Sequence, residues 1–182
     1  VLAPVNFGRM TLDIDPIFRT YNTIKGTGSE TLASQVVGWN SAIPMINRGE
    51  ILADGGDLLV GNIRNESLPW NGESCGGILG VKDLGWLILR GAISGGFILP
   101  RQGEVRVDGA QLKDVTFGPG ATTVTGISAL WDSGTFSSGA QVDILSGTRL
   151  DLYNAVITNN GVIQVQPGGY LRNVQSQPLL QG

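Results

Sequence analysis

The second half of the chain alternates apolar and polar residues with a period of two, which is the pattern of half-buried β-strands. No helical periodicity competes with this alternation there. Strands are expected near residues 105, 123, 142 and 163, and each ends in a turn that contains glycine. The alternation directs one set of side chains into a core and the other set outward. The inward set is Val105, Val107, Val142, Ile144, Ile163 and Val165, and the outward set is Arg106, Asp143 and Gln164.

A second unit recurs beside these strands: a leucine, any residue, a small or polar residue, and then a short run that ends in an apolar residue. The units begin at Leu89, Leu112, Leu130, Leu152 and Leu171, so their spacings are 23, 18, 22 and 19 residues. A coil of about 20 residues can wrap once around a narrow core, with its strands about 4.8 Å from those of the next coil. Several coils must stack, because one coil cannot bury its own apolar face.

This recurrence predicts an all-β fold, a single-stranded parallel β-helix (solenoid) of four to six coils. An antiparallel β-sandwich or a jelly roll is the alternative, because these folds also join short strands by glycine-rich turns. The recurrence of one leucine unit, rather than of strands alone, favours the solenoid.

Residues 1–48 lack the repeat, and we expect an irregular N-terminal cap or attachment region there. The stretch 29–37 is the helix candidate, with Ser29 as its N-cap and Gly38 beyond its end. Such a helix would cover the open end of the stack. The coils are expected over residues 49–176 with an inserted loop at 64–77, and residues 177–182 form a tail or a junction with a following segment.

Composition supports the solenoid and excludes several kinds of site. The chain has 28 glycines in 182 residues, about twice the ordinary usage, and 41% of its residues are hydrophobic, which is enough for a sizeable core. It has no histidine, which excludes histidine-based zinc sites and Ser-His-Asp triads. Its only cysteine, Cys75, cannot form an internal disulfide, and we expect it to be a small apolar filler. We therefore expect no metal and no cofactor.

Charge and hydropathy exclude two classes of partner. The net charge of −3 provides no basic surface for nucleic acid. The longest apolar stretch, residues 78–99, is interrupted by Lys82, Asp83 and Arg90, so we expect no membrane span. The chain does not begin with methionine, and we expect a processed product or a fragment of a longer protein.

The residue after each repeat leucine is expected to face outward, so that these residues form one exposed column. Aromatic rings flanked by cations could stack on sugar rings and hold acidic groups of a glycan. Aromatic residues and arginine are also enriched in subunit interfaces. Both interpretations stay open, as does a third in which insertions break the register. The column residues are Arg90, Lys113, Trp131, Tyr153 and Arg172.

The next position along each unit is small or polar. We interpret it as a ladder of turns in which short side chains bond to neighbouring backbone. A calcium site formed by Asp114 and Asp132 is the alternative. The ladder residues are Gly91, Asp114, Asp132, Asn154 and Asn173.

Catalysis without histidine would depend on carboxylates. Glycosidases use two carboxyl groups about 5–9.5 Å apart, and the candidate pairs are Asp54 with Asp57, Glu66 with Glu73, and Asp13 with Asp15. No recognisable motif surrounds them, and an aspartate beside glycine is more often a turn residue. In the same inserted loop as Glu66 and Glu73, Trp70 is either an exposed contact residue or a cover for the apolar face of the coil.

The leucine units and the stretch 157–174 resemble coils of right-handed parallel β-helices of the pectate-lyase type. The low charge and abundant glycine are most similar to bacteriophage tailspike and tail-fibre proteins, and the resemblance covers about residues 50–175. It implies a right-handed β-helix that assembles as a homotrimer in a virion tail, or on another extracellular surface, contacts other tail proteins and binds bacterial surface polysaccharide. Alternatives are a polysaccharide depolymerase (a glycosidase or lyase), a bacterial surface adhesin, and a capsid-type virion protein with another all-β fold.

Overall fold

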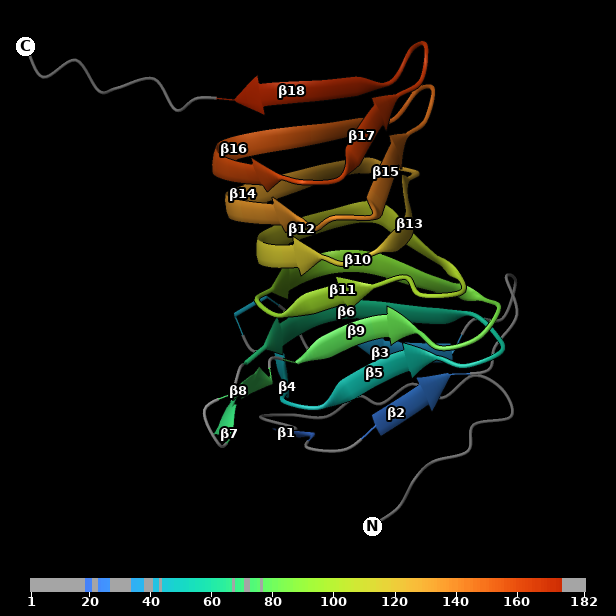
Figure 1. Ribbon diagram of the computed structural model, residues 1–182, viewed down its shortest axis with the longest axis vertical. Coiled ribbons are helices and arrows are strands. Elements are labelled where there is room, and N and C mark those ends of the chain that lie inside the picture. Colours follow the sequence, from blue (N-terminus) through green and yellow to red (C-terminus); the bar gives the residue numbers. More distant parts are fainter. Residues whose placement is uncertain are drawn as a thin grey trace, which may run out of the picture.

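The computed structural model describes residues 19–20, 23–26, 34–37, 41–42, 44–66, 68–70, 73–75 and 77–174. These residues form strands and no helix. Parallel pairing stacks the strands into a β-solenoid of about six turns, with three faces joined by corners (Figure 1). In Figure 1 the front strands run from left to right while successive coils climb, which is the sense of a right-handed helix. The antiparallel sandwich and the jelly roll are therefore wrong.

The first face is a stack of parallel strands that begins each coil. It contains β3 (Ser34–Val37), β6 (Leu58–Asn65), β10 (Trp86–Ser94), β12 (Glu104–Phe117), β13 (Gly120–Val124), β15 (Ala140–Ile144) and β17 (Val162–Val165). Three of these strands, β6, β10 and β12, are long enough to turn a corner and continue on the second face.

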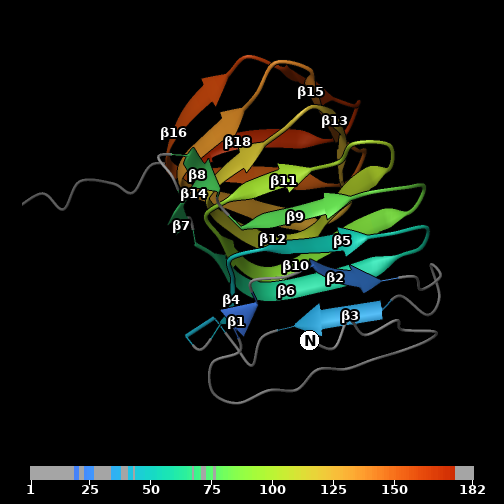
Figure 2. The ribbon, with the colours of Figure 1, turned by 60° about the horizontal axis from the view of Figure 1, so that its bottom comes forward.

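The second face contains those continuations and further strands that pair with them in parallel. The further strands are β1 (Arg19–Thr20), β4 (Met45–Asn47), β14 (Ile127–Phe136), β16 (Arg149–Asn159) and β18 (Tyr170–Val174). The third face contains the ends of β12, β14 and β16 and the short strands that Figure 2 shows stacked in one layer. Those short strands are β2 (Thr23–Gly26), β5 (Glu50–Ala53), β9 (Ile78–Val81) and β11 (Phe97–Leu99).

The core fills the space between the three faces, and the period of two decides which residues enter it. Val105, Val107, Val142 and Ile144 are at most 1% exposed, as predicted. Val165 continues the column of Ile144 but is 43% exposed. It lies on the last described coil, where no further described strand covers it.

The register of the leucine units is correct for three of the five predicted copies. Leu112, Leu130 and Leu152 occupy one column of the second face. Leu89 instead pairs with Val107 on the first face, and Ile93 takes the column position beside Leu112. The error arises because the strand pairing shifts at a bulge after Leu89, and this bulge displaces the repeat.

The last predicted copy, which begins at Leu171, starts two residues before the true column position. Leu171 pairs with Leu150, whereas Asn173 pairs with Leu152. Residues two apart on a strand share a face, so a leucine in either position fits the pattern. Only the pairing with the preceding coil distinguishes them.

The helix predicted over 29–37 is wrong for residues 34–37, which form β3 and pair with β6; residues 29–33 lie outside the described residues. Tertiary pairing overrides local helix propensity here. The boundary placed after residue 48 does not match a break in the pairing, because β2 pairs with β5 and β4 pairs with β6. Residues 175–182, with the predicted tail, also lie outside the described residues.

The insertion predicted at 64–77 contains an antiparallel hairpin of β7 (Leu68–Trp70) and β8 (Glu73–Cys75). It leaves the solenoid after β6 and before the third-face strand β9 (Figure 1). Trp70 pairs with Glu73 in its backbone register. The side-chain predictions for Trp70, Glu73 and Cys75 lie outside what the structure describes.

Candidate functional site

The corner between the second and third faces is built from residues in the left-handed backbone conformation. Asp114, Asp132 and Asn154 have φ angles of 53°, 61° and 49°, a conformation that aspartate and asparagine tolerate because their short side chains bond locally. Gly95, with φ 70°, follows Ser94, the partner of Lys113, and so takes this place in the coil below Asp114. The predicted ladder therefore exists for three residues.

The other two ladder residues lie elsewhere. Gly91 pairs with Ala110 beside the corner between the first and second faces, and Asn173 pairs with Leu152 within β18. Two of the ladder residues contact side chains: the Ser133 hydroxyl donates to Asp114 Oδ1 at 2.7 Å, and Lys113 Nζ lies 2.6 Å from Asp132 Oδ2. In the described part of the chain, no three acidic or thiol side chains gather closely enough to hold a metal ion.

The predicted outward column also exists in part. Lys113, Trp131 and Tyr153 are direct partners in three successive coils. The rings of Trp131 and Tyr153 are stacked, with centroids 4.2 Å apart and planes inclined at 9°. This stack follows from the register, which sets the two backbones one strand spacing apart.

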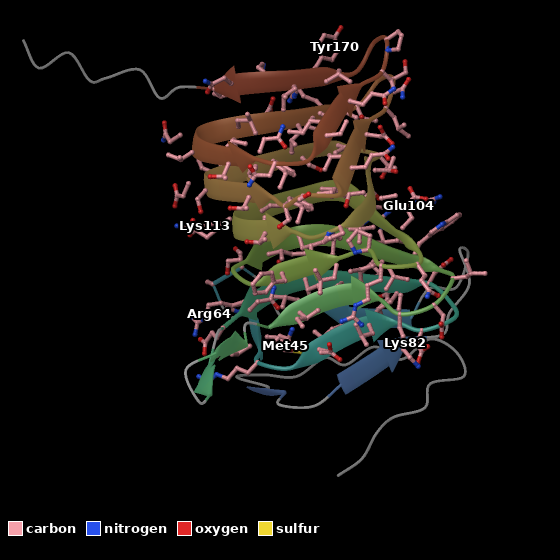
Figure 3. All side chains as sticks on the ribbon, in the orientation of Figure 1. Met45, Arg64, Lys82, Glu104, Lys113 and Tyr170 are labelled. Atoms are coloured by element: carbon pink, nitrogen blue, oxygen red, sulfur yellow. The ribbon has the colours of Figure 1, made fainter. Side chains whose placement is uncertain are left out.

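The two predicted arginines lie outside this column. Arg90 pairs with Gly61 on the first face and binds Asp108. Arg172 pairs with Asp151, two residues before the column position, although its side chain reaches Tyr153. Ser94 takes the place below Lys113, with Arg64 one coil further down. Figure 3 shows Arg64 and Lys113 on the same edge of the solenoid, with Glu104 on the other side.

A groove of about 370 Å³ lies beside this column. Tyr153 stacks on one face of the Trp131 indole from the coil above, and Trp131 lines the groove together with residues of the coils below. Trp131 is 37% exposed. The groove thus combines an exposed aromatic ring with hydroxyl, amide and charged groups. Its lining residues are Ser41, Ala92, Ile93, Ser94, Gln111, Lys113, Trp131 and Asp132.

The charged groups in the groove form an ion pair between adjacent coils. Lys113 Nζ lies 2.6 Å from Asp132 Oδ2. This hydrogen bond, followed by the attraction of the same carboxylate, raises the pKa of Lys113 above its ordinary value. Both side chains are about half exposed, so the pair is available to a ligand.

Every lysine and arginine whose side chain the structure describes forms an ion pair with a carboxylate. Each has a carboxylate oxygen within 3.6 Å of a side-chain nitrogen. The pairs are Arg48 and Arg64 with Glu66, Lys82 with Asp54, Arg90 with Asp108, Arg101 with Glu50, Arg106 with Glu104, Lys113 with Asp132, and Arg149 and Arg172 with Asp151.

The candidate catalytic carboxylates take part in these structural contacts. Asp54 lies 3.5 Å from Lys82, and Asp57 is 8% exposed and accepts a hydrogen bond from the Trp86 backbone N–H. For Glu66, the hydrogen bond from Arg48 is the main cause of a lowered pKa. A general acid needs a raised pKa, so this environment is opposite to the required one. Asp13 and Asp15 lie outside the described residues.

Several groove residues had no signal in the repeat as it was predicted. Ser94 lies in the column and Gln111 beside it; a repeat aligned on Ile93 places Ser94 in the column, whereas Gln111 precedes the repeat leucine Leu112, a position to which the predicted column does not extend. Ser41 comes from the segment between β3 and β4, and its place depends on the path of the chain rather than on a motif.

Comparisons with protein-family models, curated proteins and solved structures found no match. Within the described residues, no helix has the length and apolar character needed to cross a membrane. The interpretation of the groove therefore rests on its own chemistry.

Proposed function

We propose that this β-solenoid is a recognition module for polysaccharide, which binds in the groove beside Trp131. The observation that carries the proposal is an exposed indole held by Tyr153 at the edge of a groove with polar walls. A sugar ring has an apolar face of C–H groups and a rim of hydroxyls, so it needs an aromatic surface and hydrogen-bonding partners together.

The rigid arrangement of the ring favours binding further. The indole is stacked in the free protein, so little rotational freedom is lost when a sugar packs against it. Ser94 and Gln111 supply a hydroxyl and an amide, and the Lys113–Asp132 pair supplies donors and acceptors.

The module we propose is of the tailspike or tail-fibre type, a homotrimer on a virion tail or another extracellular surface that recognises bacterial polysaccharide. The support is the parallel solenoid together with the groove on its outer surface. Sedimentation tests the assembly: the trimer requires three times the chain mass of 19.1 kDa, and a monomer of that mass contradicts it.

The contacts of Asp54, Asp57 and Glu66 favour binding over cleavage, because each carboxylate already has a structural partner. Incubation with capsular and O-antigen polysaccharides, followed by an assay for new reducing ends, tests this choice. We expect no release, and release that is lost in Asp57→Asn would favour the depolymerase.

Binding is tested with an array of bacterial capsular and O-antigen polysaccharides. We expect Trp131→Ala to weaken binding about tenfold or more, and Trp131→Phe to weaken it less. Tyr170→Ala is the matched control, because Tyr170 is also an exposed aromatic residue, at 63%, but lies outside the groove. Absence of any polysaccharide ligand, or equal binding by Trp131→Ala, would overturn the proposal.

A further inference from the structure

The charges around the groove are already neutralised by partners within the chain. Among the described residues that line the groove, Lys113 is the only cation, and Asp132 Oδ2 lies 2.6 Å from its ammonium group. Asp114 follows Lys113 in the chain and adds a second carboxylate close to it. Two arginines share the carboxylate of Asp151, but neither lines the groove. The local charge of the groove is therefore zero or slightly negative.

An acidic sugar would gain little from such a groove. Its carboxylate would compete with Asp132 for the same ammonium group and would then lie close to two like charges. Interactions among exposed charges are weak in water, but the single attraction to Lys113 is opposed by repulsion from both Asp132 and Asp114, so their sum modestly disfavours an acidic sugar.

A pair of sugar hydroxyls fits the ion pair without breaking it. The ammonium group of Lys113 has three donors, of which Asp132 needs one. The carboxylate of Asp132 has further lone pairs that accept from a hydroxyl. One hydroxyl can thus accept from Lys113 while its neighbour donates to Asp132, as the ring packs against Trp131.

Building on the proposed function, we infer that the groove beside Trp131 selects uncharged saccharide units and that the Lys113–Asp132 pair binds their hydroxyls. This differs from the sequence-based expectation that the cations of the column hold acidic groups. The difference arises because the stacking of coils brings the carboxylate of Asp132 to Lys113, a contact that the spacing along the chain did not show.

The test compares two polymers that share one backbone, polygalacturonate and its fully methyl-esterified form, beside neutral and acidic members of the polysaccharide array. We expect wild-type protein to bind acidic polymers about fivefold or more weakly than their neutral counterparts. Binding to the neutral polymers should change little with salt, because no ionic contact to the ligand is formed.

Asp132→Asn is the decisive variant, because it releases the charge of Lys113 and asparagine tolerates the backbone conformation of this corner. We expect it to gain salt-sensitive binding to polygalacturonate. Asp143→Asn is the control, since it changes the net charge equally on the first face, away from the groove.

The outcomes separate the two proposals. The selectivity is overturned if wild-type protein binds acidic polymers more strongly than neutral ones, or if Asp132→Asn keeps the preference of wild type. In either case, a loss of binding in Trp131→Ala still supports the proposed function. No binding to any polymer of either charge overturns the proposed function itself.

Discussion

The indole of Trp131 lies parallel to the phenol ring of Tyr153 in the next coil, with 4.2 Å between the ring centroids. The two residues are direct partners in the parallel register of β14 and β16. The stack therefore belongs to the coil repeat itself, and it holds one wall of the groove in place before any ligand arrives.

Removal of the Tyr153 ring tests how much this stack contributes to the stability of the fold. We expect Tyr153→Ala to reduce the free energy of unfolding by about 1 kcal/mol and to shift the fluorescence of Trp131 towards that of a solvated indole. Tyr153→Phe keeps the ring and is the control, with little change in either quantity. Equal denaturation midpoints for the two variants would show that the stack does not stabilise the fold.

Asn154 has the left-handed backbone conformation, with φ 49°, so its replacement tests the backbone strain at this corner. We expect Asn154→Ala to be less stable than Asn154→Gly by about 1 kcal/mol, because alanine is strained in this conformation and glycine is not. Both variants remove the side chain, so their difference isolates the backbone term. Urea unfolding measures it, and a more stable alanine variant would contradict the assignment of strain.

Two buried asparagines link the lower coils. Asn47 Nδ2 donates to Asn65 Oδ1 at 2.9 Å, and Asn65 Nδ2 donates to the Gly95 carbonyl at 3.0 Å. We expect Asn65→Ala to cost about 1–3 kcal/mol, because it leaves buried polar groups without partners. Asn173→Ala, at an exposed position of β18, is the control and should change thermal stability little. Similar melting temperatures for both variants would contradict a structural role for Asn65.

Two valines occupy the same inward column but differ in how deeply they are buried, so they test whether burial, rather than position in the pattern, determines stability. Val107 is 1% exposed and Val165 is 43% exposed. We expect Val107→Ala to reduce the free energy of unfolding by about 2 kcal/mol, and Val165→Ala by clearly less, since less apolar surface is lost from the core. Chemical denaturation of both variants measures the difference. Equal losses would mean that the last coil is covered in solution.

The lowered pKa of Glu66 makes the stability of the fold depend on pH in the acidic range. The hydrogen bond from Arg48 lowers this pKa below its ordinary value of 4.5, so the folded state holds the proton less tightly than the unfolded state. The stabilisation is complete above that ordinary value and is lost as the pH falls through the lowered pKa. We expect Glu66→Gln to be less stable at neutral pH, by about 1 kcal/mol, and to lose less stability on acidification.

Urea unfolding at neutral and acidic pH checks this prediction. Glu104→Gln is the control, because the contact of Glu104 with the Arg106 guanidinium is longer, at 3.6 Å. A pH dependence of Glu66→Gln that matches wild type would show that another group titrates in this range.

The inward and outward positions of the coils could be predicted because they depend only on a period of two within one strand. Val105 and Val107 are buried for this reason. The groove could be predicted only in part. Lys113, Trp131 and Tyr153 were found from the repeat, whereas Ser94 was missed because the bulge after Leu89 changes the register of that coil.

The sequence by itself determined that the chain forms stacked parallel coils and that its corners use glycine, aspartate and asparagine, because both properties follow from local patterns. Beyond the column of Lys113, Trp131 and Tyr153 that the repeat predicts, tertiary structure decided which residues meet across coils, since that depends on the number of residues in each corner and insertion. Lys113 meets Asp132, and Arg172 meets Asp151, across separations of 19 and 21 residues. The Lys113–Asp132 contact neutralises the cation of the groove, and the Arg172–Asp151 contact lies outside the groove.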